Sequence, residues 1–263
     1  MNNKTLYSLY LFPTLLHIFL VTVIAGVLKK VGFELGYHST LGNVLIILGG
    51  ISSALWGVIY QKKCHRKKPL EILKEFFDVR QTIKGYLLVV IFLIVDFGTV
   101  ILSNGFRMES PWLLFMLFLK ALVLGGIEEI GWRYSFQPDL EKKLPYVVAT
   151  IMTFICWGVW HFLFFYIDGS LTAVDIPFFF LGLLTSSFIL SALFAYSNSL
   201  WICAMTHALI NAFSQISVNG NEMTSMILRL ACIDLAIMLF YLSRKKNSKI
   251  FYLLSQSNQK IIK

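Results

Sequence analysis

The sequence is poor in charge and in proline. Of its 263 residues, 14% are charged and only 6 are proline, whereas 57% are hydrophobic. A soluble domain has about a quarter charged residues, so these charges are too few to cover a soluble surface. The same composition excludes a disordered chain, a collagen and a coiled coil. A polytopic membrane protein is the class that remains.

Cysteine is also scarce, and its spacing indicates no metal finger and no disulfide framework. None of the 4 cysteines forms a C-x₂-C pair. Three of them, Cys156, Cys203 and Cys232, lie inside apolar stretches. We expect them to be small buried hydrophobic residues.

Apolar stretches recur along the whole chain, and each is long enough to cross about 30 Å of hydrocarbon as a helix. We predict an all-α, polytopic membrane protein that forms a single integral membrane domain over 1–263. The eight predicted spans are 6–28, 41–60, 83–104, 112–131, 146–166, 176–195, 200–217 and 224–242.

The net charge of +9 comes from short basic runs between the apolar stretches, which argues against nucleic acid as a partner. If both termini are cytoplasmic, the inside segments hold 18 of the 23 Lys and Arg residues and the outside loops hold 3. This bias predicts cytoplasmic termini and membrane lipid as the surrounding partner. The basic stretch 61–82 is interpreted either as a short helix on the anionic inner leaflet or as a solvated loop. The sequence gives no oligomeric state.

Ionisable side chains inside the predicted spans are costly to insert, so each is a functional candidate. They are His17, Asp96, Lys120, Glu128, Glu129, His161, His207, Arg229 and Asp234. We expect the two aspartates and the arginine to pair between helices. The two glutamates and the two later histidines, with the neutral Asn211, form a coherent set within a predicted catalytic core over 112–217.

The segment around Glu128 and Glu129 places two adjacent carboxylates near the end of an apolar stretch. On a helix, Glu129 and Arg133 are i,i+4 neighbours that can pair. Glu128 points about 100° away from its neighbour and has no such partner. An unpaired carboxylate in an apolar setting suits a general base that acts on water.

The histidines supply the other groups that hydrolysis needs. His207 and Asn211 share one helix face, so both can donate hydrogen bonds to a developing oxyanion. Glu128 lies 16 residues before Leu144, and His161 lies 16 residues after Pro145. In a helical hairpin that turns there, both lie about 24 Å from the turn. This level match requires the helix from residue 112 to continue to Leu144.

In order along the chain, Glu128-Glu129-x-x-x-Arg133, Trp157-x-x-x-His161 and His207-x-x-x-Asn211 occur within apolar stretches. This order resembles the CPBP family, also called Abi, which includes the CAAX prenyl proteases and bacteriocin-processing enzymes. The resemblance covers about 120–215. Where the family often has Gly and Phe, this chain has Tyr134 and Trp157, and the tryptophan is expected to change the pocket shape.

The resemblance implies an intramembrane endopeptidase whose site opens toward the cytosolic leaflet and whose substrate is a peptide or lipidated protein. It implies that Glu128 and His161 activate water and that His207 and Asn211 form the oxyanion site. Glu129 and Arg133 are implied to be structural or to orient the substrate. A bacterial plasma membrane is the expected location, because residues typical of an AT-rich genome are abundant.

Three alternatives remain at this point. Glu128, His161 and His207 are a donor set for zinc, although the chain has no H-E-x-x-H motif and we favour no cofactor. Cys203 is an i,i+4 neighbour of His207, which allows a thiol nucleophile. The buried charges also suit a non-catalytic scaffold, an immunity protein or a small transporter.

Overall fold

The computed structural model describes residues 3–103, 105–218 and 220–261. Helices make up 81% of it, and the described residues form no strand, which confirms the all-α prediction. An isolated bridge joins Phe106 and Ser217. The helical elements are α1 (Asn3–Leu6), η1 (Tyr7–Leu11), α2 (Phe12–Lys30), α3 (Thr40–Gly50), α4 (Ser52–Cys64), α5 (Pro69–Phe76), α6 (Ile83–Asp96), α7 (Gly98–Leu102), α8 (Pro111–Leu124), η2 (Gly126–Glu128), α9 (Glu129–Gly131), η3 (Trp132–Phe136), α10 (Gln137–Glu141), α11 (Tyr146–Asp168), α12 (Ile176–Ser197), α13 (Leu200–Ile216) and α14 (Glu222–Ile261).

Within the described residues, five helical segments are long and apolar enough to span a membrane. They are Tyr7–Lys30, Thr40–Cys64, Tyr146–Asp168, Ile176–Ser197 and Glu222–Lys245. These segments support an integral membrane protein. The other three predicted spans contain the shorter helices α6 with α7, α8 and α13, so the count of eight stays a prediction.

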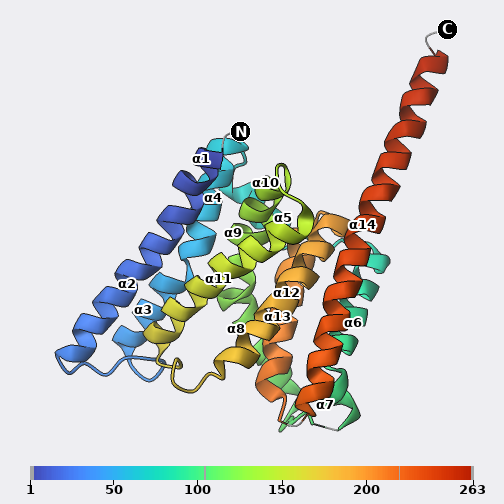
Figure 1. The fold of residues 1–263 in the computed structure, drawn as a ribbon. Coiled ribbons are helices and arrows are strands. Elements are labelled where there is room, and N and C mark those ends of the chain that lie inside the picture. The colour runs from blue at the N-terminus through green and yellow to red at the C-terminus, as the bar shows by residue number, and fades with distance from the viewer. Residues whose placement is uncertain (1–2, 104, 219, 262–263) are drawn as a thin grey trace.

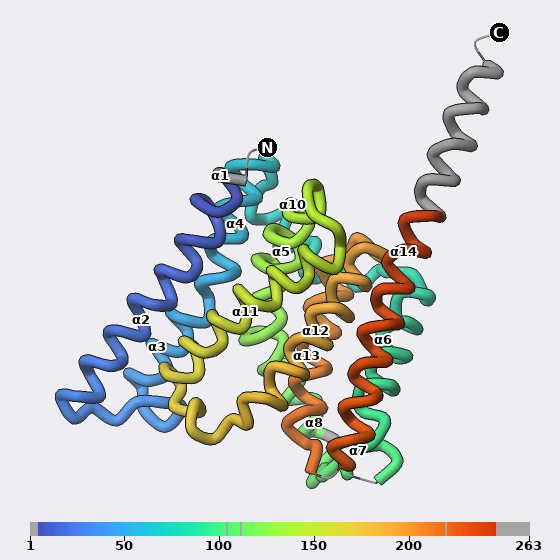
Figure 2. Tube along the Cα trace, viewed as in Figure 1, coloured from blue at the N-terminus to red at the C-terminus, as the bar shows by residue number. Residues whose placement is uncertain are grey.

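Helix α11 crosses the middle of the bundle and connects its two sides (Figures 1 and 2). It packs against α2 and α3 on one side and against α12 on the other. Beyond α12 lie α14 and α6, and α13 pairs closely with α8. The first histidine of the predicted site is therefore on the central helix, and the second is on the α8–α13 pair.

Polar side chains define where many helices begin. Ser39, Thr82, Ser110, Asp175 and Ser199 each precede a helix and accept a hydrogen bond from a backbone amide in its first turn. Such caps satisfy amides that have no partner inside the helix. They fix the starts of α12 and α13, and hence the register of the site residues on α13.

The helix predicted to run unbroken from residue 112 to Leu144 is interrupted, so that expectation was wrong. Helix α8 ends at Leu124, and the chain then passes through the 3₁₀ turn η2, the short α9, the π-helical turn η3 and α10. Gly125 lets α13 approach closely, since a Cβ atom there would lie 2.6 Å from Nδ2 of Asn211. Glu128 therefore lies on a 3₁₀ turn rather than on a regular α-helix.

The basic stretch contains a helix, α5, so the interpretation as a solvated loop was wrong. Ile72 and Phe76 are buried, and α5 packs against α13. Leu70, Leu73 and Phe77 on its other face are exposed. An amphipathic helix of this kind fits a membrane surface, and its place on the inner leaflet stays a prediction.

The start of α2 and the end of the Glu222–Lys245 span lie at the same end of the bundle (Figure 1). The α4–α5 connection and the α10–α11 turn, which carry many of the basic residues, lie at that end too (Figure 1). Lys29 and Lys30 are at the opposite end of α2. The arrangement is the one that both termini on one side would require, and the cytoplasmic assignment of that side stays a prediction.

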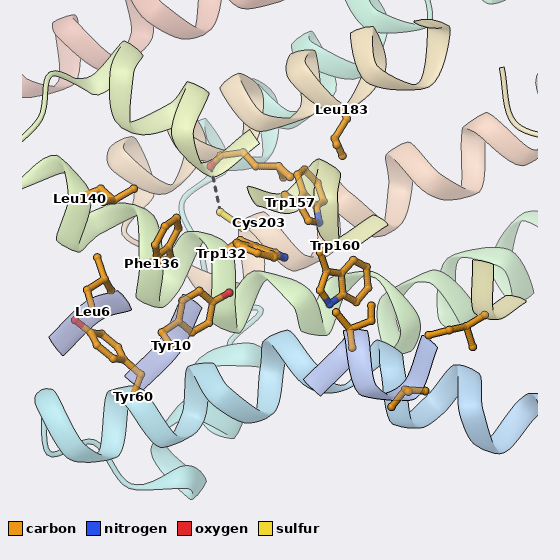
Figure 3. Close-up of a cluster of buried hydrophobic side chains, with 14 of the residues drawn as sticks. Leu6, Tyr10, Tyr60, Trp132, Phe136, Leu140, Trp157, Trp160, Leu183 and Cys203 are labelled. Carbon is orange, nitrogen blue, oxygen red and sulfur yellow. Dashed lines mark hydrogen bonds between the residues drawn. The ribbon is translucent and has the colours of Figure 1, made fainter. Parts of the chain in front are cut away.

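A cluster of buried aromatic side chains fills the bundle around the predicted site (Figure 3). Trp132, Trp157 and Trp160 are each less than 2% exposed, and Tyr10 packs edge-on against Trp132. Large, rigid side chains of this kind bury much apolar area and leave little freedom to their neighbours. The polar site residues are thus held in a stiff surrounding.

Candidate active site

Glu128 is buried where the 3₁₀ turn meets helices α4 and α11. Its side chain is 5% exposed. Ser53 on α4 donates a hydrogen bond to its backbone carbonyl at 3.2 Å. The indole Nε1 of Trp157 on α11 donates to its Oε2 at 2.7 Å. Among the described residues only Trp157 donates a hydrogen bond to this carboxylate, so Oε1 is left for a further partner.

His161 lies one helical turn after Trp157 and faces the same carboxylate. Its Nε2 is 3.9 Å from Oε2 of Glu128. This distance is too long for a direct hydrogen bond and suits a bridge through one water molecule. The other ring nitrogen, Nδ1, is buried without a hydrogen-bond partner among the described residues. The level match that the hairpin predicted between Glu128 and His161 is therefore present, despite the interrupted helix.

Glu129 is fully buried and binds two groups that come from different helices. His207 on α13 places Nδ1 2.8 Å from its Oε1. Arg133 places Nε 3.5 Å from its Oε2, which is the i,i+4 pairing expected from the sequence. The arginine also donates from Nη2 to Oγ of Ser187 at 3.1 Å. Because opposite charges face each other, the burial of the carboxylate and the guanidinium is compensated.

His207 and Asn211 converge on the backbone of Gly125. A Cβ atom at this glycine would lie 2.6 Å from Nδ2 of Asn211 and 3.2 Å from Nε2 of His207. The two nitrogens therefore point to the same small space above the 3₁₀ turn. Two nitrogens that converge on one point have the geometry of an oxyanion site.

Trp157 connects the two halves of the candidate site. Its ring centroid lies 5.2 Å from that of His161 and 5.3 Å from that of His207. The guanidinium carbon of Arg133 lies 4.0 Å from the indole centroid. Sequence reasoning treated this tryptophan only as a change of pocket shape. Its place four residues before His161, on the same helix face, was the signal that could have assigned it to the site.

The structure brings Glu128 together with His161, and it brings His207 together with Glu129. The first pairing is the one that the sequence predicted. The second is different, since His207 was expected to face the same water as Glu128 and instead has Glu129 as its nearest charged partner. The catalytic roles of all six residues stay predictions.

The zinc alternative does not fit the arrangement of these side chains. In the described part of the chain, no group of three or more His, Cys, Asp or Glu residues is placed to hold a metal ion. Oε2 of Glu128 is already bonded to Trp157, and Nδ1 of His207 faces Glu129. A ligand set of Glu128 and the two histidines would require these contacts to be broken.

Two other residues from the sequence analysis have local partners. Cys203 is fully buried, and its thiol donates to the carbonyl of Leu190 at 3.4 Å (dashed line in Figure 3). A nucleophilic thiol must be accessible, so this placement argues against the thiol alternative. Asp96 pairs with Arg229 across 3.6 Å between α6 and α14, which confirms that part of the expected pairing between helices.

Comparisons with known proteins point to one family. Residues 110–213, which contain all six site residues, match the family described as Type II CAAX prenyl endopeptidase Rce1-like. The chain is also similar to CAAX prenyl protease 2 of Methanococcus maripaludis, with 26% identity over 187 residues. That similarity covers 62% of this chain and 66% of the relative, which is just under two thirds of its length.

An all-helical membrane bundle that buries a glutamate beside a histidine has the form of an intramembrane enzyme site. The two matches support assigning the chain to the CPBP family of CAAX proteases, so the resemblance carried by the three motifs is confirmed.

Proposed function

We propose that this protein is an intramembrane endopeptidase of the CAAX type, which hydrolyses a peptide bond of a membrane-associated substrate near the cytosolic leaflet. Glu128 and His161 activate water, and His207 and Asn211 stabilise the oxyanion. The observation that carries the proposal is the buried pair of Glu128 and His161, with 3.9 Å between Oε2 and Nε2. A water molecule in that gap contacts a carboxylate and an imidazole at once.

The reaction needs one proton transfer in each direction. Glu128 accepts a proton from the water as its oxygen forms a bond to the scissile carbonyl carbon. The carbonyl oxygen becomes an oxyanion, which accepts hydrogen bonds from Nδ2 of Asn211 and from Nε2 of His207. The C–N bond then breaks, and the leaving amine takes up the proton that the carboxyl group received. No step in this sequence passes through a metal ion.

The substrate class follows from the matched family and the bilayer. We infer a peptide or protein that carries a lipid at a C-terminal cysteine, because both matched descriptions name prenyl peptidases. The bilayer around the bundle retains such a lipid, so the peptide is presented at the membrane surface. Bacteriocin processing and immunity, which the resemblance also allowed, gain no support from either match.

Cleavage by the purified protein in liposomes tests the proposal. The probes are a farnesylated C-terminal CAAX peptide and the same peptide without the lipid. We expect the wild type to cleave the farnesylated probe and Glu128→Gln to lose at least about 100-fold in kcat/KM, the scale of a general base. Glu109→Gln is the matched control, because this carboxylate is exposed and pairs with Arg107.

Equal cleavage by Glu128→Gln would remove this residue from the mechanism. No cleavage of any probe by the wild type would instead favour a non-catalytic scaffold or a transporter. Inhibition by a chelator, with recovery on addition of zinc, would overturn the metal-free sequence of steps.

A further inference from the structure

The indole of Trp157 touches more of the candidate site than any single motif residue does. Its N–H donates to Glu128, its face carries the guanidinium of Arg133, and its ring packs against both histidines. The side chain is only 1% exposed. It is therefore enclosed by the site residues and lies behind the surface that a substrate can reach.

We propose that Trp157 is a positioning residue, whose indole N–H holds the Glu128 carboxylate with one oxygen toward His161 and the other open to the reacting water. This inference rests on the proposed function, since it assigns a task within the same reaction. It goes beyond that function because Trp157 is absent from the set of groups that handle protons.

The hydrogen bond has the properties that this task requires. A donor to a carboxylate forms a charge-assisted bond, about twice as strong as one between neutral groups. The bond from Nε1 of Trp157 to Oε2 of Glu128 is 2.7 Å long and is shielded from water. Without it, the carboxylate could rotate about its terminal torsion, because such torsions are broad. Fixing this angle fixes the direction in which Glu128 meets the water.

Arg133 supports the indole from its other side. Its guanidinium carbon is 4.0 Å from the ring centroid of Trp157, so a cation rests on the electron-rich face of the ring. The same arginine pairs with Glu129 at 3.5 Å. The contacts form a closed path from Glu129 through Arg133 and Trp157 to Glu128. This path links the two adjacent glutamates of the motif through their side chains.

The departure from the family pattern gives the inference a sharp test. The resembling family often has Phe where this chain has Trp157, and a phenyl ring has no hydrogen to donate. The substitution Trp157→Phe thus keeps an aromatic ring against Arg133 and His161 and removes the donor to Glu128.

Trp160 supplies a matched control on the same helix. It is also 1% exposed, and its Nε1 donates to Oγ of Ser52 at 2.8 Å. It also packs against His161, with 5.1 Å between ring centroids. Trp160→Phe therefore removes an equally buried indole donor and the same volume, and it leaves Glu128 untouched.

Kinetics in liposomes with the farnesylated peptide form the first readout. For Trp157→Phe we expect kcat to fall about 10- to 100-fold, the effect of losing one hydrogen bond to a charged group. KM should stay within about twofold, because the enclosed indole does not reach the substrate. Trp160→Phe should keep kcat within about threefold of the wild type. An unchanged kcat in Trp157→Phe, or an equal loss in both variants, would overturn the inference.

The second readout does not depend on activity. In ¹⁵N-tryptophan-labelled protein, each of the 6 tryptophans gives one indole N–H resonance, and the two phenylalanine variants assign two of these resonances. We expect Glu128→Gln to move the Trp157 resonance upfield, because the anionic acceptor is lost, and to leave the Trp160 resonance in place. An unmoved Trp157 resonance would refute the contact itself. If that resonance moves and no probe is cleaved, the proposed function fails while the contact stands.

Discussion

Nδ1 of His207 lies 2.8 Å from Oε1 of Glu129, and both side chains are buried. An ionised carboxylate only accepts hydrogen bonds, so Nδ1 is the donor in this contact. Nε2 of the same ring then carries a proton only when the imidazole is cationic. The proposed contact of His207 with the oxyanion therefore requires an imidazolium that Glu129 stabilises.

Glu129→Gln tests this dependence. We expect kcat to fall at least tenfold, because a neutral amide no longer stabilises the cationic ring or fixes its orientation. The measurement is steady-state cleavage of the farnesylated peptide in liposomes. Glu141→Gln, which removes a part-buried carboxylate beside Arg244, serves as the control. Full activity in Glu129→Gln would show that His207 works without the cation.

Gly125→Ala tests the convergence of His207 and Asn211 on the 3₁₀ turn. The added methyl group would lie 2.6 Å from Nδ2 of Asn211 and 3.2 Å from Nε2 of His207, so both must shift. We expect kcat to fall at least about 100-fold, because a displacement near 1 Å has that effect on aligned groups. In Gly85→Ala the new atom meets nothing closer than 3.5 Å. That variant should keep wild-type activity, and an active Gly125→Ala would argue against an oxyanion site at this place.

The sequence predicted the helical class and the meeting of Glu128 with His161. Apolar stretches of membrane-spanning length report helices, because a lipid surrounding leaves backbone groups no other partner. The two residues are equally far from Pro145, so a hairpin brings them to one level. That argument succeeded because it depends mainly on counting residues from a shared turn.

The sequence did not predict the break after Leu124 or the contact of Trp157 with Glu128. The break depends on how closely α13 approaches Gly125, and that distance is a property of packing between helices that are far apart in the chain. The indole contact depends on one side-chain rotation toward a 3₁₀ turn. Hydrophobic periodicity carries no information about either, since both arise only when the bundle is assembled.

Cys203→Ala separates the carboxylate mechanism from the thiol alternative. The thiol is fully buried and bonded to the carbonyl of Leu190, away from solvent. We expect activity within about twofold of the wild type, together with resistance to a thiol-alkylating reagent. Cys232→Ala, another buried cysteine, controls for the loss of a core sulfur atom. Loss of cleavage in Cys203→Ala alone would support the thiol as nucleophile.

Asp139 on α10 links the stability of the bundle to pH. Burial alone would raise its pKa, but hydrogen bonds from Lys142 and Tyr60 and the nearby His65 outweigh burial and hold the pKa below its ordinary value. A carboxyl group with a lowered pKa stabilises the folded state at any pH above its unfolded pKa of about 3.9. That stabilisation is lost as the pH falls through the lower folded pKa.

Asp139→Asn should therefore lower the midpoint of thermal unfolding in detergent by about 2–4 °C at pH 7, on the order of 1 kcal/mol. The difference from the wild type should shrink below about pH 4, since both proteins then lack the charge. Asp78→Asn is the control, because that aspartate is exposed and bonds only Arg80 and Gln81 beside it. A gap that persists unchanged to pH 3 would mean that the amide disturbs packing and that the charge of Asp139 contributes nothing to folding.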